Sequence, residues 1–283
     1  MSRRRRVIVL DTVGLSPDHL TLPETAANIT SLASGGYYRA MRPVFPAVTL
    51  PVQASLTTGE YPRSHGIVAN GTFFADNCQV AFWEQASKLV QSPRIWDALK
   101  QEDPGFKTAT LFLQNTLYAE CEAIITPKPI HTDSGLVQWC YSKPPGLYES
   151  VSERLGEFNL MHYWGPMASI ESSRWIAGAA LETLDRLKPD LMFVYLPHLD
   201  YCSQRLGPTH RGVLEELKKI DAEIGRIVKG VADLALEGDT VFVLLSEYTF
   251  SEVSRDIPIN RKLRENGLIE VRTIGGREYL DLE

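Results

Sequence analysis

The sequence predicts an α/β fold with a mostly parallel central sheet, helices on both faces and an irregular cap-like insertion. Short apolar runs of strand length alternate with longer segments whose apolar residues recur at helical spacing. Acidic residues follow three of these apolar runs, at the strand ends where ligands bind in parallel sheets. A chain of 283 residues can bury one full core, so we expect a single domain over residues 1–283.

The strands are expected where apolar residues cluster without helical spacing. Residues 6–13 predict a buried strand whose carboxyl end carries Asp11. Gly275 and Gly276 predict a turn between two short strands within residues 268–282. The other expected strands are residues 37–44, 107–113, 190–196 and 240–245.

Residues 214–236 carry the clearest helical pattern, with Leu217, Ile220, Ile224 and Ile227 at helical spacing. Residues 49–58 predict a helix that begins at Thr49 and is closed by Gly59. The other expected helices are residues 25–33, 94–100, 172–187 and 260–266.

Between residues 115 and 165 no period is sustained, because prolines, aromatic residues and polar residues are mixed. We expect this segment to form a cap-like insertion over the sheet. Long irregular segments of this kind often carry function.

Composition excludes some functions and leaves others open. The net charge of −6 argues against a broad nucleic-acid surface but leaves room for a small phosphate ester at a local site. No apolar run reaches the length of a membrane span, and Val7–Leu10 is too short for an export signal after the basic start. The four cysteines lack CxxC spacing, so we expect reduced thiols in a cytoplasmic protein.

Three acids follow three of the predicted strands, namely Asp11, Asp200 and Glu247. If the strand ends meet at one edge of the sheet, these like charges are costly to bring together unless a cation neutralises them. The pattern therefore favours a divalent metal site. The alternative is that each acid caps the helix that follows it.

Thr49 is a candidate nucleophile, because the first turn of a helix favours negative charge and a bound metal would favour the alkoxide. The alternative is an ordinary helix cap, a common role for threonine.

The surrounding motif gives these residues a context. Residues 44–51 read VFPAVTLP, residues 54–59 read ASLTTG and residues 61–71 read YPRSHGIVANG. This run resembles the "FPAVT…SLxTGxxPxxHGIxxN" signature of the type I phosphodiesterase / nucleotide pyrophosphatase family in the alkaline phosphatase superfamily. Residues 195–208 and 245–248 resemble later metal-binding segments of the same family, so the resemblance covers nearly the whole chain.

The resemblance implies an alkaline phosphatase-like fold and a hydrolase of phosphodiester or pyrophosphate bonds, acting on a small phosphate ester or nucleotide. By its motifs, Thr49 would be the nucleophile and a metal ligand, forming a covalent phosphothreonine. Asp11, Asp200 and Glu247 would complete the ligands of two metal ions, zinc in the family. Asn70 would hydrogen-bond a non-bridging phosphoryl oxygen.

Three positions depart from the family pattern. Glu247 and Tyr248 stand where the family usually has Asp-His, and Gln204 stands in place of a histidine. The remaining ligands are all oxygen donors, which suit magnesium or manganese better than zinc. Two other readings therefore stay open: another hydrolase of the superfamily, such as a phosphomonoesterase or phosphonate hydrolase, and a catalytically inactive binding relative.

Three histidines lie near these motifs. We expect His65 to make turn hydrogen bonds and His210 to begin a helix. His198 lies two residues before Asp200 and would share its face on a strand, either as a ligand or as a partner of the ligand.

Overall fold

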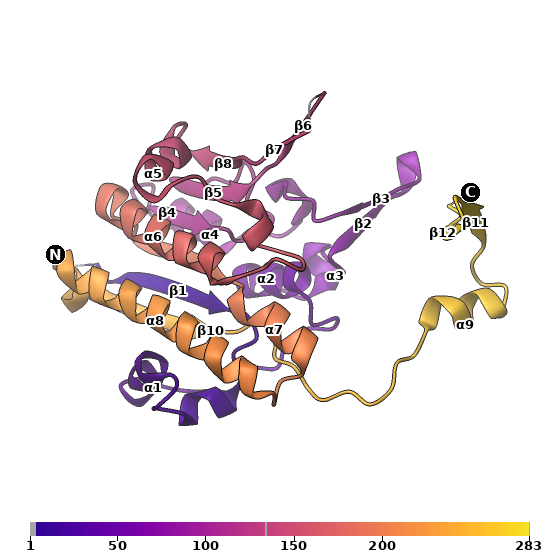
Figure 1. The fold of residues 1–283 in the computed structure, drawn as a ribbon. Helices are drawn as coiled ribbons and strands as arrows, with labels where there is room; N and C mark the ends of the chain where they lie inside the picture. The colour runs from indigo at the N-terminus through magenta and orange to yellow at the C-terminus, as the bar shows by residue number, and fades with distance from the viewer. Residues whose placement is uncertain (1–3, 134, 283) are drawn as a thin grey trace.

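In the computed structural model, which describes residues 4–133 and 135–282, six strands form a central sheet in the order β10–β1–β9–β4–β5–β8 (Figure 1). The strands are β1 (Arg6–Thr12), β4 (Thr108–Leu111), β5 (Ala123–Pro127), β8 (Cys140–Lys143), β9 (Leu191–Leu196) and β10 (Thr240–Leu245). Neighbouring strands are parallel except β8, which pairs antiparallel with β5 at one edge. The expected mostly parallel sheet is confirmed.

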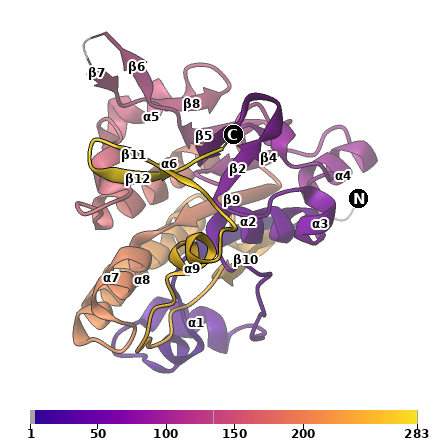
Figure 2. The ribbon, with the colours of Figure 1, turned by 90° about the vertical axis from the view of Figure 1, so that its right-hand side faces the viewer.

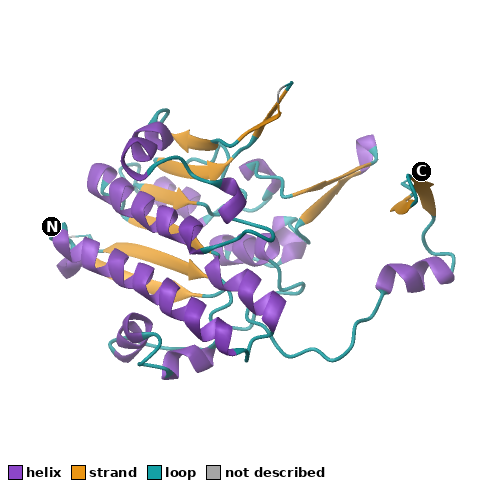
Figure 3. Ribbon diagram, in the orientation of Figure 1, coloured by secondary structure: helices purple, strands orange, loops and turns teal. Residues whose placement is uncertain are grey.

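Helices cover both faces of the sheet (Figure 3). The α-helices are α1 (Ala27–Ser34), α2 (Thr49–Thr58), α3 (Pro62–His65), α4 (Ile95–Glu102), α5 (Leu147–Leu155), α6 (Ile170–Leu187), α7 (His198–Leu206), α8 (Arg211–Asp233) and α9 (Ile259–Glu265). Short 3-10 helices are η1 (Pro17–Thr21), η2 (Ala75–Asn77), η3 (Ser87–Leu89), η4 (Leu160–His162) and η5 (Glu237–Asp239).

The core follows the two-residue period of the strands. Ile8 and Leu10 of β1 are fully buried in one cluster with residues of α6 and α8. Val9 belongs to a second cluster with Trp96 of α4 and Phe193 of β9. Because successive side chains of a strand point to opposite faces, one strand supplies both clusters and is held in the middle of the fold.

The segment 115–165 is not the irregular cap that we expected. It supplies β5 and β8, which complete the central sheet, and α5, which packs against α6 and β8. Within it the hairpin of β6 (Ile130–Thr132) and β7 (Gly135–Val137) pairs outside the central sheet. β5 is short and ends at Pro127, and all five of its residues are buried. Because both faces of the strand are covered, its sequence does not alternate between apolar and polar residues, and the strand could not be recognised.

The expected strand over residues 37–44 is also wrong, because this segment forms no strand or helix. Its apolar side chains stay exposed, as at Tyr37 with 83% of its surface accessible. A strand needs a neighbour for its backbone groups, and β-forming residues alone do not provide one.

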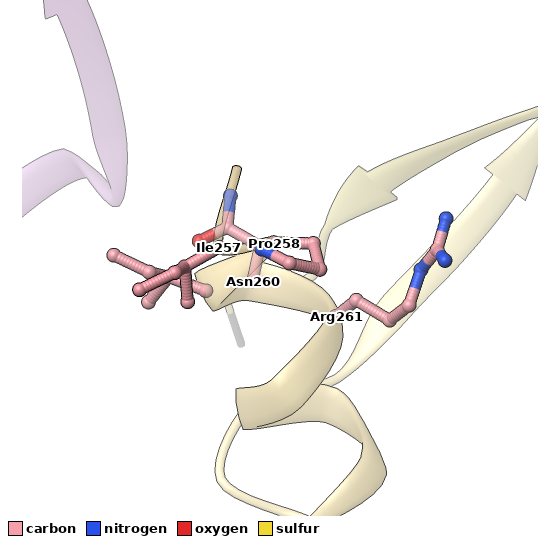
Figure 4. Close-up of a pocket in the computed structure, with 5 residues that line it drawn as sticks. Ile257, Pro258, Asn260 and Arg261 are labelled. Atoms are coloured by element: carbon pink, nitrogen blue, oxygen red, sulfur yellow. The ribbon is translucent and has the colours of Figure 1, made fainter. Parts of the chain in front are cut away.

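After Glu247 and Tyr248 the chain leaves the body of the molecule as a C-terminal arm, residues 249–282 (Figures 1 and 2). It carries α9 and the hairpin of β11 (Val271–Ile274) and β12 (Arg277–Leu280), close to the expected helix and strand pair. An open depression of about 340 Å³, lined by Ile257, Pro258, Ile259, Asn260 and Arg261, lies on this arm (Figure 4). The arm adds little to the core, since Ile257 and Leu268 are 76% and 70% exposed.

A second small hairpin, β2 (Gly71–Phe74) with β3 (Gln79–Phe82), follows Asn70. None of the helices in the described parts of the chain is long and apolar enough to cross a membrane.

Candidate active site

Three neighbouring strands bring the predicted acids to one edge of the sheet. Asp11 near the end of β1 is in register with Leu245 of β10 on one side and Tyr195 of β9 on the other. Glu247 follows β10 by two residues, and Asp200 lies in the first turn of α7, directly after β9. The strand ends thus bring Asp11 and Glu247 into contact, while Asp200 lies at the same edge and is joined to them through Tyr248.

Asp11 and Glu247 form a buried pair, with only 2% and 0% of their surfaces exposed. Gln53 of α2 joins them: its Nε2 donates to Asp11 Oδ2 at 3.4 Å and also to Glu247 Oε1. Gln53 Oε1 accepts from the backbone N–H of Gln114 at 2.7 Å, which fixes the amide with its nitrogen toward the acids. The other oxygens of the pair, Asp11 Oδ1 and Glu247 Oε2, are buried without a hydrogen-bond partner outside the pair, and the two carboxyl groups hydrogen-bond each other.

This burial makes the charged form of the pair costly. Desolvation raises the pKa of Asp11 to about 7, although hydrogen bonds from Glu247 and Gln53 act in the opposite direction. Desolvation, and then the neighbouring Asp11 carboxylate, raise the pKa of Glu247 well above its usual range. Without a cation, the pair therefore retains a proton near neutral pH.

Thr49 is the first residue of α2, as predicted, and is 4% exposed. Its hydroxyl lies 3.5 Å from the Tyr248 hydroxyl and close enough to Glu247 to lower the pKa of that carboxyl group. Because Thr49 begins α2, a phosphoryl group attached to this hydroxyl would lie at the N-terminal end of the helix, where the helix dipole is positive.

Asn70 lies beside the start of the same helix. Its Oδ1 accepts from the backbone N–H of Leu50 at 3.0 Å. This contact leaves the NH₂ of the amide as the end that can donate to a substrate oxygen.

Asp200 has different surroundings. Its Oδ1 accepts a hydrogen bond of 3.1 Å from the Tyr248 hydroxyl, and Gln204 follows one helical turn further on as a neutral amide that lowers the pKa of this carboxyl group. Burial raises the pKa of Asp200, and both side chains oppose this rise. Burial and the nearby Asp200 and Glu247 carboxylates raise the pKa of Tyr248, so its hydroxyl keeps its proton.

The expected place of His198 on a strand is wrong, because it begins α7. Its Nε2 lies 2.7 Å from Glu216 Oε2 on α8, so it joins two helices instead of facing Asp200 as a ligand would. His65 makes the expected local bonds, to Ser55 Oγ at 2.8 Å and from the Ile67 N–H at 3.2 Å. His210 caps the start of α8, accepting from the Gly212 N–H.

Gln53 was not predicted from the sequence, and neither were the contacts of Tyr248. Gln53 lies four residues after Thr49 on α2, so helical spacing could have placed it on the same face. Tyr248 was noted as a departure from the family pattern, but its contact with both Thr49 and Asp200 depends on the fold. In the described part of the chain, no three His, Cys, Asp or Glu side chains come together as a metal-binding group.

A comparison with family models gives a match to "Type I phosphodiesterase / nucleotide pyrophosphatase" over residues 7–283. This range contains every candidate residue of the site. The chain belongs to this family.

Relatives in this type I phosphodiesterase family are distant in sequence. Mouse ectonucleotide pyrophosphatase/phosphodiesterase family member 1 is 23% identical over 221 residues, covering 78% of this chain and 21% of the relative. An uncharacterized pyrophosphatase/phosphodiesterase of Schizosaccharomyces pombe is 22% identical over 253 residues, covering 88% of this chain and 45% of the relative. The chain thus spans less than half the length of these relatives.

Solved structures share the fold. Phosphonoacetate hydrolase of Sinorhizobium meliloti, in complex with phosphonoacetate, superposes with a TM-score of 0.66 at 17% identity, over 95% of this chain and 64% of its own. An inactive variant of murine ectonucleotide pyrophosphatase/phosphodiesterase 5, in complex with AMP, gives a TM-score of 0.61 at 16% identity, over 94% and 63%. The fold is thus alkaline phosphatase-like, as the sequence resemblance implied.

Proposed function

We propose that the chain is a metal-dependent hydrolase of phosphodiester or pyrophosphate bonds in small nucleotide-like substrates, with Thr49 as the nucleophile. One observation carries the proposal: the Thr49 hydroxyl lies at a helix start and against a buried carboxyl pair that has two oxygens with no partner outside the pair. A threonine that only capped its helix would need no such pair.

The residues fit one divalent cation. Asp11, Glu247 and Thr49 would hold it, since the orphaned carboxylate oxygens lack a partner outside the pair and the pair carries excess negative charge when ionised. This oxygen-only donor set suits magnesium or manganese. When bound, the cation would lower the pKa of the Thr49 hydroxyl and offset the charge of the phosphoryl group.

The residues do not fit the second of the two zinc ions that the family resemblance implied. Around Asp200 the neighbouring side chains are Tyr248 and Gln204, where zinc prefers imidazole or thiolate. We derive no step from a second ion.

The chain's own groups account for the steps of the reaction. Thr49 Oγ1 would pass its proton to the ionised Glu247 carboxylate and attack phosphorus, while the leaving oxygen departs with a proton from water. Water would then cleave the Thr49–phosphorus ester, leaving its hydroxyl on phosphorus and returning a proton to Thr49 Oγ1. Asn70 is placed to donate to a non-bridging oxygen, and the N–H groups at the start of α2 stabilise the same developing charge.

A second candidate is a phosphonate hydrolase or phosphomonoesterase. The structural likeness to a phosphonoacetate hydrolase supports this second candidate, because it shows that the fold of this chain also occurs in a phosphonate hydrolase. An inactive binding relative is the third reading, motivated by Tyr248 and Gln204. A cytoplasmic location and the lack of a nucleic-acid surface stay predictions.

The test is hydrolysis of bis-nitrophenyl phosphate, nitrophenyl phosphate and phosphonoacetate by the metal-stripped chain after Mn²⁺, Mg²⁺ or Zn²⁺ is restored. We expect the diester to be the best substrate. Thr49→Ala should abolish turnover, and Thr58→Ala, a control at the other end of α2, should retain it. Equal turnover by Thr49→Ala would contradict the proposal, and preference for phosphonoacetate would favour the second candidate.

A further inference from the structure

The buried acids of the site fall into two groups that are satisfied in different ways. Asp11 Oδ1 and Glu247 Oε2 are buried with no hydrogen-bond partner outside the carboxyl pair. Asp200, in contrast, receives a hydrogen bond of 3.1 Å from the Tyr248 hydroxyl, and the neutral amide of Gln204 lowers its pKa. A buried carboxylate without hydrogen-bond partners is costly unless a cation neutralises it. A carboxylate that already accepts a hydrogen bond gains less from a cation.

Tyr248 occupies the space between the nucleophile and Asp200. Its hydroxyl lies 3.5 Å from Thr49 Oγ1 and 3.1 Å from Asp200 Oδ1. Its ring is held by Phe250, with ring centroids 5.8 Å apart and planes at 90°, and it packs against the main core cluster. Packing thus holds the hydroxyl between Thr49 and Asp200.

The donors near Asp200 also disfavour a second ion on chemical grounds. Gln204 follows Asp200 by one helical turn and is a neutral amide, a weak ligand for zinc. His198, two residues before Asp200, is hydrogen-bonded to Glu216 of α8 and is not available as a ligand.

We propose that the Tyr248 hydroxyl takes the place of a second cation, linking Asp200 to Thr49, so that this chain holds a single divalent cation at Asp11 and Glu247. Tyr248 is then a positioning residue for Thr49: its hydrogen bond to Asp200 fixes the oxygen that faces the nucleophile. The inference rests on the proposed function only for the place of the first cation.

The deciding experiment counts cations per chain by elemental analysis after dialysis of the metal-stripped protein against Mn²⁺ or Zn²⁺. We expect one Mn²⁺ per chain, lost in Asp11→Asn and retained in Asp200→Asn. Two tightly held ions in the parent, none at all, or loss of the ion in Asp200→Asn would each overturn the proposal.

A gain of binding tests the role of the two neutral side chains. The double variant Tyr248→His with Gln204→His places imidazole groups beside Asp200, so it should bind one Zn²⁺ more than the parent. If the folded double variant binds the same number of ions as the parent, Tyr248 and Gln204 do not exclude the second cation and the proposal fails.

Tyr248→Phe tests the positioning role in case the double variant does not fold. We expect kcat to fall about fivefold to tenfold, the effect of one hydrogen bond, with KM and the Mn²⁺ count unchanged. Tyr148→Phe is the matched control. Tyr148 lies on α5, and its hydroxyl oxygen accepts a hydrogen bond of 3.3 Å from the Phe158 N–H. Removing this hydroxyl should leave kcat unchanged. An unchanged kcat in Tyr248→Phe would contradict the role.

The number of bound cations and the turnover of phosphate esters can be measured separately, so a wrong cation count and a wrong function give different results. A chain that binds one Mn²⁺ but hydrolyses no phosphate ester contradicts the proposed function and leaves the cation count standing. A chain that turns over with two bound ions supports the proposed function and overturns the inference.

Discussion

The carboxyl pair at the ends of β1 and β10 and the single carboxyl group on α7 lie at the same sheet edge, yet their environments differ. Asp11 and Glu247 share one amide donor and leave two oxygens with no partner outside the pair, while Asp200 accepts a hydrogen bond from the Tyr248 hydroxyl. Position at a strand end gathers acids, and the neighbouring side chains decide which of them needs a cation.

The largest expected effect separates the two acidic positions by turnover. Asp11→Asn removes a ligand of the proposed cation and should lower kcat/KM by roughly 10³-fold, because a catalytic cation supplies several kcal/mol of charge stabilisation. Asp200→Asn should lower it only about tenfold, since it weakens one hydrogen-bonded link. Steady-state kinetics with Mn²⁺ measure kcat/KM of both variants. Equal losses in the two variants would contradict the different roles proposed for Asp11 and Asp200.

A smaller effect concerns the amide that joins the pair. Gln53→Met keeps the side-chain volume but removes the donor to both acids and leaves the Gln114 N–H without its acceptor. In the metal-free chain we expect a loss of about 3 kcal/mol in the free energy of unfolding, from buried polar groups left unpaired. Urea unfolding measures it, and a loss below about 0.5 kcal/mol would mean that these hydrogen bonds contribute little.

A further effect is a dependence of stability on pH. The folded-state pKa of Asp11 is about 7, against 3.8 for an ordinary aspartate. Between these pH values the folded chain binds more protons than the unfolded chain, so the free energy of unfolding falls as pH rises. Urea unfolding of the metal-free chain should show this decline from about pH 4 to about pH 7.

Two comparisons make the pH measurement specific. Asp11→Asn should have a shallower decline than the parent, because it lacks the group that titrates. Added Mn²⁺ should also flatten the decline, since a bound cation favours the ionised pair. A parent and an Asp11→Asn chain with the same pH dependence would contradict the assignment to this pair.

Much of the fold was predictable where the chain carries long periodic or terminal signals. The helix that begins at Thr49, the long α8 and the strands β1, β9 and β10 lie close to their expected bounds. The short strands β5 and β8 were missed, because four or five fully or half-buried residues have no period that distinguishes a strand.

The site was predictable in its members but not in its contacts. Asp11, Thr49 and Glu247 come together as the strand-end pattern and the family resemblance implied, although their roles stay proposals. His198 and Tyr248 could not be placed from the sequence, because α7 was not expected and Tyr248 meets Thr49 from 199 residues away. Whether residues 1–283 form a single domain stays a prediction.

Trapping a covalent ester on Thr49 would show whether this residue is the nucleophile. The Mn²⁺-restored chain would be quenched with acid during turnover of bis-nitrophenyl phosphate, digested and analysed by mass spectrometry. The account predicts a nitrophenyl phosphate ester or phosphate on the peptide that contains Thr49, absent from the metal-stripped chain and from Thr49→Ala. Steady turnover in Thr49→Ala, or an ester on another residue, would contradict it.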